Sequence, residues 1–334
     1  MNVAVIGSGS WGTAVAAMVA SRVSTTLWAR RQESAAEMTS DRENKSYLPG
    51  IELPESLAVT SDLATALDGA EIVIMAVPSH GVREVLERAK NLVGGDARIV
   101  SLSKGVERGS QLRMTEIVAE VLPIDPAHIG VLTGPNLARE VALGQPAAAV
   151  VAFTDQTIAG ELQMLFMHPR FRVYTNPDVV GCESAGALKN VMAIAAGMAH
   201  GLEYGDNSKA ALVTRALAEL TRLGVALGGA PFTFAGLAGM GDLVATCFSE
   251  QSRNRRVGVE LGRGKSLEVI VTEMNMVAEG VKSTEAVLAL AELHEIEMPI
   301  AKMVGSVLYD GSRPADMVEG LMTREAKAEL HGIE

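Results

Sequence analysis

An apolar run followed directly by a glycine-rich turn opens the chain, and no other feature limits its possible folds as strongly. Val3–Ile6 has the composition of a short strand, residues 7–12 are GSGSWG, and a helical pattern follows over Thr13–Ser21. Such a turn leaves backbone N–H groups at the helix N-terminus, where they can face an anion. A flexible glycine turn is the alternative, but the strand before it and the helix after it favour a dinucleotide-binding site.

Each glycine of this turn is expected to have its own role. Gly7 permits the tight turn, Gly9 lets a pyrophosphate approach the backbone, and Gly12 lets the helix pack closely on the strand. The amides of Ser10, Trp11 and Gly12 would then face the phosphates. We therefore predict that these five residues bind a dinucleotide.

Further apolar runs alternate with helical patterns through the first half of the chain. Several are almost wholly apolar, as expected for parallel strands that are covered on both faces. The candidate strands are Val3–Ile6, Thr25–Trp28, Leu57–Thr60, Ile72–Ala76, Ile99–Leu102, Ile129–Leu132 and Ala148–Ala152. Strands separated by helices form βαβ units, so we predict an α/β fold that begins with a Rossmann-like doubly wound sheet.

The pattern changes after Asn176–Pro177, where Ala-rich segments of helical period take over. A chain of 334 residues exceeds what one core usually supports, so two domains are expected. We predict a dinucleotide-binding domain over residues 1–180 and an all-α substrate domain over residues 181–334, with a ligand cleft at their junction. The clearest helical segments are Ser208–Gly228, Gln251–Gly262, Glu279–His294 and Pro299–Leu308.

The charge balance argues against nucleic acid as a partner. Twenty-nine basic and 40 acidic residues give a net charge of −11, so there is no global basic field and an anionic ligand must meet a local cluster. Cys182 and Cys247 show neither metal-ligand spacing nor a disulfide pattern, which indicates a reducing cytoplasm and no metal site. Glycines interrupt the two long uncharged stretches, residues 1–21 and 223–241, so no membrane partner is expected.

The end of the second strand bears on the choice between NAD and NADP. An acidic residue there would bond the ribose 2′-hydroxyl, but the sequence TLWARRQE places Arg30 and Arg31 at that point. Two guanidinium groups suit a 2′-phosphate, which favours NADPH over NADH. A solvated pair of loop arginines is the alternative, and Glu33 follows closely enough to leave both cofactors open.

An arginine-rich segment, QSRNRRVG, stands out in an acidic chain. Ser252, Arg253, Asn254, Arg255 and Arg256 lie at the predicted start of a helix, where the dipole already favours anions. A solvated basic helix end is the alternative. The interleaved Ser and Asn favour phosphate oxygens as ligands, because they add neutral donors beside the guanidinium groups.

Lys189 and Asn190 interrupt a helical segment, residues 186–197 (GALKNVMAIAAG), that otherwise consists of small and apolar residues. Either the ammonium extends to water along its carbon stem or it faces a site inside the protein. Asp242 in AGMGDLVATC could be a helix cap, and Lys104 in SLSKG could be an ordinary loop lysine. If the three groups converge, a buried lysine kept protonated by a carboxylate suits a general acid in carbonyl reduction.

These stretches resemble the bacterial type of NAD(P)-dependent glycerol-3-phosphate dehydrogenase over nearly the whole chain. The motifs in the family's order and spacing are GSGSWGTA, YLPG, AVPSH, SKG, TGPN, GALKN, AGMGDL, QSRNRR, VAEG and EMPI. The resemblance implies a Rossmann domain followed by a helical domain, with NADPH or NADH as cofactor. It also implies reversible reduction of dihydroxyacetone phosphate to sn-glycerol 3-phosphate, a phospholipid precursor, by a homodimer.

The same resemblance implies roles for single residues. Lys189 matches the catalytic acid/base, Lys104 a second active-site lysine that contacts cofactor and substrate, and Asp242 the carboxylate that joins Lys189. The other substrate residues implied are Gly134, Asn136, Ser252, Arg253 and Asn254, with Arg253 also near the cofactor. The other cofactor residues implied are Ser10, Trp11, Arg31, Ala138, Val277 and Glu279. Asn136 departs from many relatives, which carry Ser or Thr, and the Gly134–Asn136 turn could also be a simple helix start.

Two other functions remain compatible with the sequence. A β-hydroxyacid or 2-ketoacid reductase would share the two-domain plan and a catalytic lysine, but its substrate would carry a carboxylate. A dinucleotide-sensing protein would bind the cofactor without turnover, and it would give no reason for Lys104, Lys189 and Asp242 to occur together.

Overall fold

The computed structural model describes residues 1–274, 278–326 and 328–329, and they form two compact units. Unit 1 comprises Met1–Ser103 and Leu112–Val179, and unit 2 comprises Lys104–Gln111 and Val180–Glu334. The predicted boundary at residue 180 therefore assigns residues 104–111 to the wrong unit. Residues 104–111 leave the sheet and belong to the helical unit, because Val106 is buried in its hydrophobic core.

Unit 1 is built on one eight-stranded sheet in the order β3-β2-β1-β4-β5-β6-β7-β8. Its strands are β1 (Asn2–Ile6), β2 (Ser24–Trp28), β3 (Leu57–Thr60), β4 (Ile72–Met75), β5 (Arg98–Ser101), β6 (Ile129–Thr133), β7 (Ala147–Ala152) and β8 (Phe171–Asn176). Neighbouring strands are parallel except β6 and β7, where Leu132 lies opposite Val151 in an antiparallel pair. The sequence pattern predicts the first seven strands, but β8 and the antiparallel pairing of β6 with β7 were not predicted.

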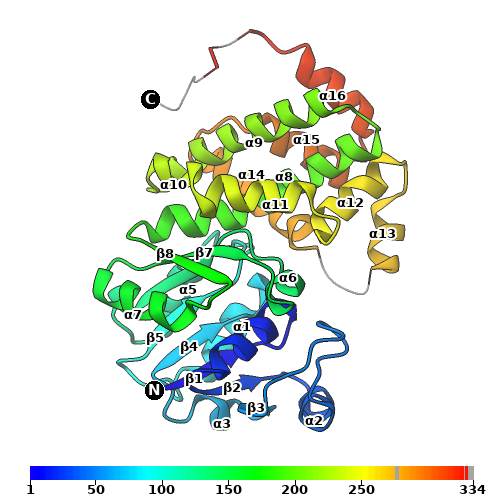
Figure 1. The fold of residues 1–334 in the computed structure, drawn as a ribbon. Coiled ribbons are helices and arrows are strands. Elements are labelled where there is room, and N and C mark those ends of the chain that lie inside the picture. The colour runs from blue at the N-terminus through cyan, green and yellow to red at the C-terminus, as the bar shows by residue number, and fades with distance from the viewer. Residues whose placement is uncertain (275–277, 327, 330–334) are drawn as a thin grey trace. The chain divides into compact units, whose positions relative to one another are not determined.

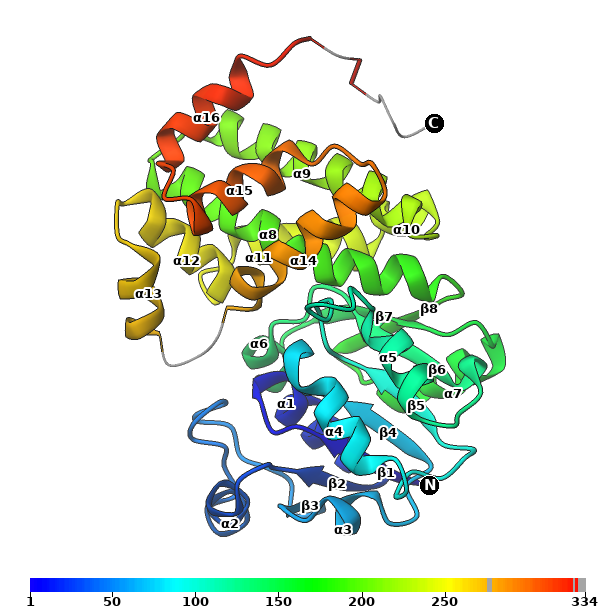
Figure 2. The ribbon, with the colours of Figure 1, turned by 180° about the vertical axis from the view of Figure 1, so that it is seen from behind.

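Helices cover both faces of this sheet (Figure 1). They are α1 (Ser10–Ala20), α2 (Gln32–Asp41), α3 (Leu63–Leu67), α4 (Val82–Ala89), α5 (Met114–Val121), α6 (Ala138–Ala142) and α7 (Gln156–Phe166), with the short turns η1 (Ser79–Gly81) and η2 (Pro126–His128). Apolar residues of α1 and α7 share one core with the sheet, and those of α3, α4 and α5 share the core on the opposite face (Figure 2). The strands are therefore apolar on both sides, which explains their nearly continuous hydrophobic runs.

Unit 2 is helical throughout the part that the structure describes. Its helices are α8 (Val179–Gly201), α9 (Asp206–Ala226), α10 (Pro231–Ala235), α11 (Asp242–Phe248), α12 (Arg253–Gly262), α13 (Leu267–Glu273), α14 (Glu279–Leu293), α15 (Pro299–Tyr309) and α16 (Pro314–Met322), with one π-helical turn, η3 (Leu237–Gly241). Among the described residues, α8 alone has the length and hydropathy of a membrane span, but 94% of that window is buried within the protein. This burial is typical of a central core helix.

Paired glycines bring α8 and α12 into close contact. A Cβ added to Gly197 would lie 2.1 Å from the carbonyl oxygen of Arg255, and one added to Gly258 would lie 2.0 Å from that of Ile194. One turn further along, Gly201 and Gly262 repeat the arrangement. The two backbones can approach this closely because neither helix carries a side chain at the crossing. The packing holds the helix that bears Lys189 against the helix that begins at Arg253.

Candidate active site

The glycine turn of unit 1 has the geometry that its sequence predicts. Gly7 has φ +121°, and a Cβ there would lie 2.6 Å from the carbonyl oxygen of Ala76. A Cβ on Gly12 would lie 2.1 Å from the carbonyl oxygen of Gly7, so α1 can pack on the turn only with glycine at this position. Gly9 precedes α1 and would have no atom within 4 Å of an added Cβ. A ligand can therefore approach the backbone at Gly9, whereas Gly7 and Gly12 are packed against other backbone atoms of the protein.

Ser10 and Trp11 begin α1 beside this opening. The Ser10 hydroxyl donates to the carbonyl of Tyr47 at 2.6 Å, which ties the helix start to a distant segment. The indole Nε1 of Trp11 is shielded from solvent and has no hydrogen-bond partner among the described residues. Its ring lies 6.2 Å from that of Phe171. A helix N-terminus with an open glycine and an unused buried donor fits an anionic dinucleotide.

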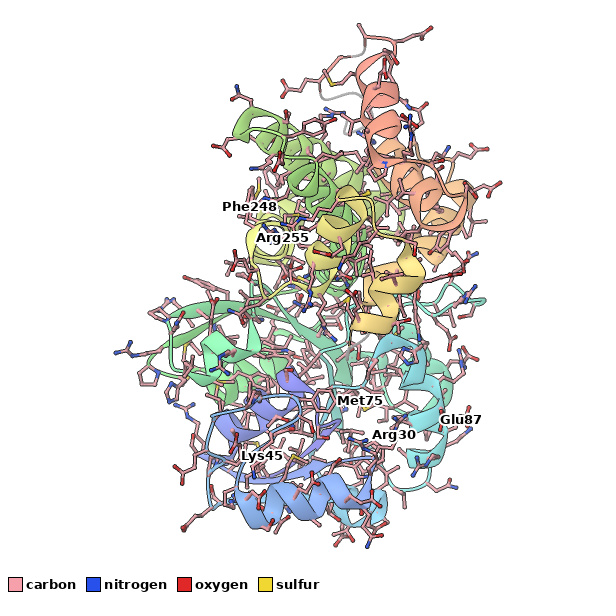
Figure 3. The ribbon with its side chains drawn as sticks, turned by 90° about the vertical axis from the view of Figure 1, so that its right-hand side faces the viewer. Arg30, Lys45, Met75, Glu87, Phe248 and Arg255 are labelled. Carbon is pink, nitrogen blue, oxygen red and sulfur yellow. The ribbon has the colours of Figure 1, made fainter. Side chains whose placement is uncertain are left out.

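Arg30 and Arg31 follow β2 and are both exposed. Arg31 directly precedes α2, and Arg30 lies near the carboxyl end of the sheet, where β4 also ends at Met75 (Figure 3). Exposed guanidinium groups at this edge are accessible to a ligand phosphate. Glu33 lies in the first turn of α2 and is exposed as well.

Unit 2 contains a buried cluster of two ammonium groups and one carboxylate. Lys104 Nζ lies 2.6 Å from Asp242 Oδ2, and Lys189 Nζ lies 3.0 Å from Asp242 Oδ1. The side chains of Lys189 and Asp242 are 6% and 3% exposed. The Lys189 ammonium therefore does not extend to bulk water, and the carboxylate of Asp242 has two ammonium partners. Three separate elements supply the groups: the segment after β5, helix α8, and the start of α11 directly after the π-helical turn η3.

Thr246 completes this cluster and is not among the residues predicted from the sequence. Lys189 Nζ donates to Thr246 Oγ1 at 2.5 Å, and the Thr246 hydroxyl donates to Asp242 Oδ1 at 3.3 Å. The signal that could have found it is spacing, because residues four apart share one face of a helix. Burial is the main factor that lowers the pKa of Lys104, while Asp242 opposes the shift and the charge of Lys189 adds to it. A lysine in this setting gives up its proton more readily than one in water.

A chain of side-chain amides links this cluster to α12 and α14. Asn190 Nδ2 donates to the carbonyl of Lys104 at 3.1 Å, and Asn254 Nδ2 donates to Asn190 Oδ1 at 3.0 Å. Asn254 Oδ1 accepts from the backbone N–H of Gly280 at 2.9 Å. Through these contacts the side chain of Asn254 connects α12 to α8 and α14. Its predicted role as a phosphate ligand through the side chain is thus restricted to its remaining N–H.

The arginine-rich segment forms the N-terminus of α12. The Ser252 hydroxyl accepts from the backbone N–H of Arg255 at 3.2 Å and caps the helix. Arg253 and Arg256 are exposed and Arg255 is half-buried (Figure 3 labels Arg255). A ten-residue helix that starts with exposed guanidinium groups is suited to an anion.

The remaining predicted residues lie elsewhere in the two units. Gly134, with φ +130°, and Asn136 follow β6, and both polar atoms of the Asn136 side chain are shielded without a partner among the described residues. Ala138 begins α6, and Glu279 begins α14. Val277 lies outside the described residues. Across the described part of the chain, no group of three His, Cys, Asp or Glu residues forms a metal site.

A dinucleotide turn on a doubly wound sheet, followed by a helical unit with buried ammonium groups, defines the class of two-domain, dinucleotide-dependent oxidoreductases. Sequence profiles narrow this to one family: that of the NAD-dependent glycerol-3-phosphate dehydrogenase N-terminus matches residues 2–159, and that of its C-terminus matches residues 178–319. The chain therefore belongs to the NAD-dependent glycerol-3-phosphate dehydrogenase family.

Individual relatives agree with this family assignment. Glycerol-3-phosphate dehydrogenase [NAD(P)+] 2 of Sphingopyxis alaskensis is 52% identical over 99% of both chains, and glycerol-3-phosphate dehydrogenase [NAD(P)+] of Corynebacterium glutamicum is 50% identical over 98% of this chain and 100% of its own. The crystal structure of glycerol-3-phosphate dehydrogenase from Coxiella burnetii has a TM-score of 0.92 and 38% identity, covering 97% of this chain and 99% of its own. A ketopantoate reductase from Ralstonia eutropha, with a TM-score of 0.60 and 16% identity over 95% of this chain and 100% of its own, shares the fold alone.

Proposed function

We propose that this protein catalyses the reversible, NAD(P)H-dependent reduction of dihydroxyacetone phosphate to sn-glycerol 3-phosphate. One observation carries the chemistry beyond the family assignment: a buried lysine, Lys189, is held between a carboxylate and a hydroxyl. An ammonium has three donor hydrogens. The described contacts of Lys189 Nζ, to Asp242 and Thr246, occupy two of them. The third can donate to the oxygen of a ketone.

The residues of the glycine turn and the strand end after β2 would hold the cofactor. Gly7, Gly9 and Gly12 shape the turn, the amides of Ser10 and Trp11 face the pyrophosphate, and Arg30 and Arg31 face the ribose. When bound, the reduced nicotinamide supplies the hydride that the ketone carbon accepts. Ala138, Glu279 and Val277 are proposed as further cofactor contacts by analogy with the family.

Lys189 acts as the general acid in the direction of reduction. It donates a proton to the oxygen that becomes an alkoxide, a role typically worth about 10²–10⁴-fold in rate. Asp242 orients the Lys189 ammonium, and the ammonium of Lys104 pairs with the same carboxylate. In the reverse direction Lys189 accepts the proton.

The N-terminus of α12 binds the phosphate of the substrate. Arg253 supplies a guanidinium, while Ser252 and Asn254 shape the helix start and hold it beside Asn190. Gly134 and Asn136 are proposed as further substrate contacts. The two buried, unpartnered polar atoms of Asn136 support this role, because such groups are costly unless a ligand satisfies them.

We propose NADPH as the preferred cofactor and a cytoplasmic homodimer, without nucleic-acid or membrane partner, as the working form. Two arginines at the ribose end of the site support the first proposal. A net charge of −11 and two buried cysteines that are not joined in a disulfide agree with the second. The product would serve as a precursor of glycerophospholipids.

The decisive experiment follows the absorbance at 340 nm with dihydroxyacetone phosphate and either reduced nicotinamide. We expect turnover with both and a higher kcat/KM with NADPH. Turnover of a 2-ketoacid instead would favour a ketoacid reductase, and cofactor binding without any turnover would favour a sensing protein.

Arg253→Ala should raise the KM for dihydroxyacetone phosphate about ten- to hundredfold, because it removes a charge-assisted hydrogen bond. An unchanged KM would remove the phosphate role.

A further inference from the structure

We infer that Asn44 is a positioning residue for dinucleotide binding, acting through the Ser8–Gly9 peptide of the glycine turn. The inference rests on the proposed function only in so far as the turn binds the cofactor. Asn44 lies after α2, outside the glycine motif, and it is 4% exposed although its neighbours Glu43, Lys45 and Ser46 are half-buried or exposed. A buried asparagine in a polar surface segment needs partners, because an unsatisfied amide is costly.

The side chain of Asn44 uses both of its polar atoms. Its Nδ2 donates to the carbonyl of Ser8 at 2.9 Å and to Thr13 Oγ1 at 2.8 Å. Its Oδ1 accepts from the backbone N–H of Tyr47 at 3.2 Å. Thr13 is fully buried on α1. One amide therefore joins the glycine turn, the helix that follows it and the segment after α2.

The bond to Ser8 sets the direction of a ligand-facing donor. In a trans peptide the C=O and the N–H that follows point in opposite directions. Because Asn44 holds the carbonyl of Ser8, the N–H of Gly9 is directed away from Asn44. Among the residues that the structure describes, this N–H has no hydrogen-bond partner, and no atom lies within 4 Å of a Cβ at Gly9. Asn44 thus presents a free backbone donor to the open side of the turn.

The rest of this segment is fastened to the same unit. The Ser10 hydroxyl donates to the carbonyl of Tyr47 at 2.6 Å, and Arg139 Nη1 donates to the carbonyl of Pro49 at 2.7 Å. The N–H of Gly50 donates to Glu43 Oε1 at 2.7 Å. Lys45, which Figure 3 labels, pairs with Asp41 of α2 at 2.7 Å. Three of these contacts, those of Tyr47, Pro49 and Lys45, join the segment to other elements of unit 1, and the bond between Gly50 and Glu43 closes the segment on itself, so the segment can hold the Ser8 carbonyl in place.

The test compares Asn44→Asp with Asn91→Asp, the same chemical change at an exposed turn of unit 1. The dissociation constant for NADPH is measured by fluorescence titration without substrate. We expect Asn44→Asp to raise it about ten- to hundredfold, because aspartate cannot donate to Ser8 and repels its carbonyl. At saturating NADPH, kcat and the KM for dihydroxyacetone phosphate should stay within about twofold of wild type. Asn91→Asp should change neither quantity.

Asn44→Ala covers the case in which the aspartate variant does not fold, since it removes the amide without adding charge. Its NADPH affinity should also fall, and amide exchange at Gly9 should change in the ligand-free variant. Wild-type affinity in a folded Asn44 variant would overturn the inference, as would a loss of thermal stability with unchanged affinity. If the wild-type protein binds NADPH but does not reduce dihydroxyacetone phosphate, the proposed reaction is wrong, whereas the inference about Asn44 is unaffected.

Discussion

The two units build their functional groups in opposite ways. In unit 1 the turn at Gly7–Gly12 depends on missing side chains, and the donors that it is predicted to offer are backbone N–H groups at the start of α1. In unit 2 the cluster of Lys104, Lys189 and Asp242 works through charged side chains that are largely or fully buried. The first arrangement has no room for a Cβ at Gly7 or Gly12, and the second loses its ion pairs when one charged side chain is removed. The same substitution to alanine should therefore harm the two units by different physical routes.

Lys189→Ala should have the largest effect. It removes the proposed proton donor, so kcat for dihydroxyacetone phosphate should fall about 10²–10⁴-fold. The dissociation constant for NADPH should stay close to that of wild type, because the turn lies in unit 1. Steady-state kinetics and a binding titration check both points, with Lys302→Ala on the exposed face of α15 as control. Turnover like that of wild type would remove Lys189 from the mechanism.

Asp242→Asn should come next, because it leaves two buried ammonium groups without their carboxylate. Breaking a buried ion pair from one side typically costs about 3–5 kcal/mol of unfolding free energy. The pKa of Lys104 should fall further, since Asp242 is the main group that raises it against burial. Chemical denaturation of the variant measures the loss. Asp316→Asn removes a carboxylate from an exposed pair with Arg313 and should cost much less stability, because water screens exposed ion pairs. Equal losses of unfolding free energy in the two variants would contradict the view that Asp242 belongs to a buried ion-pair cluster.

Two substitutions in the glycine turn should separate the effect of a glycine on protein packing from its effect on cofactor binding. Gly12→Ala forces a Cβ against the carbonyl of Gly7 and should cost about 1–3 kcal/mol of stability. Gly9→Ala meets no atom of the protein and should cost about 1 kcal/mol or less, yet it should weaken NADPH binding because the methyl group faces the ligand side. Thermal melts and binding titrations of both variants show whether the two effects separate. NADPH binding like that of wild type in Gly9→Ala would show that the phosphates of the cofactor do not bind at this turn.

The last prediction, whose substitution should leave activity unchanged, concerns a second buried carboxylate of unit 2. Glu219 on α9 accepts from the backbone N–H groups of Ile300 and Ala301 at the start of α15. Burial raises its pKa from 4.5 to about 7. Between these values the folded state binds more protons than the unfolded state, so stability falls as the pH rises. We expect unit 2 to lose about 1–3 kcal/mol between pH 5 and pH 8 through this group. Melting curves of Glu219→Gln should show a smaller pH slope, and an unchanged slope would contradict this reasoning.

Strands and helices with strong local patterns were predictable, and the exceptions have physical causes. β8 lacks the continuous apolar run of the inner strands, because exposed Arg172 and Tyr174 alternate with buried Phe171 and Val173 at the edge of the sheet; this alternation is itself a strand signal, and it was overlooked. The antiparallel pairing of β7 could not be predicted, because pairing direction depends on the path of the chain through the five-residue helix α6. Lys104, Lys189 and Asp242 were predicted as single candidate residues, whereas Thr246 was overlooked.

The sequence by itself determined the dinucleotide turn, the succession of strands and helices, and the family. These follow from local restrictions: backbone torsion angles at glycine, apolar periodicity, and helix starts each depend on a few neighbouring residues. Only the tertiary structure decided that Lys104 leaves the sheet to join unit 2 and pairs with Asp242, 138 residues further along the chain. Charge pairing in a buried site depends on which distant segments pack together, and no local pattern in the chain records that choice.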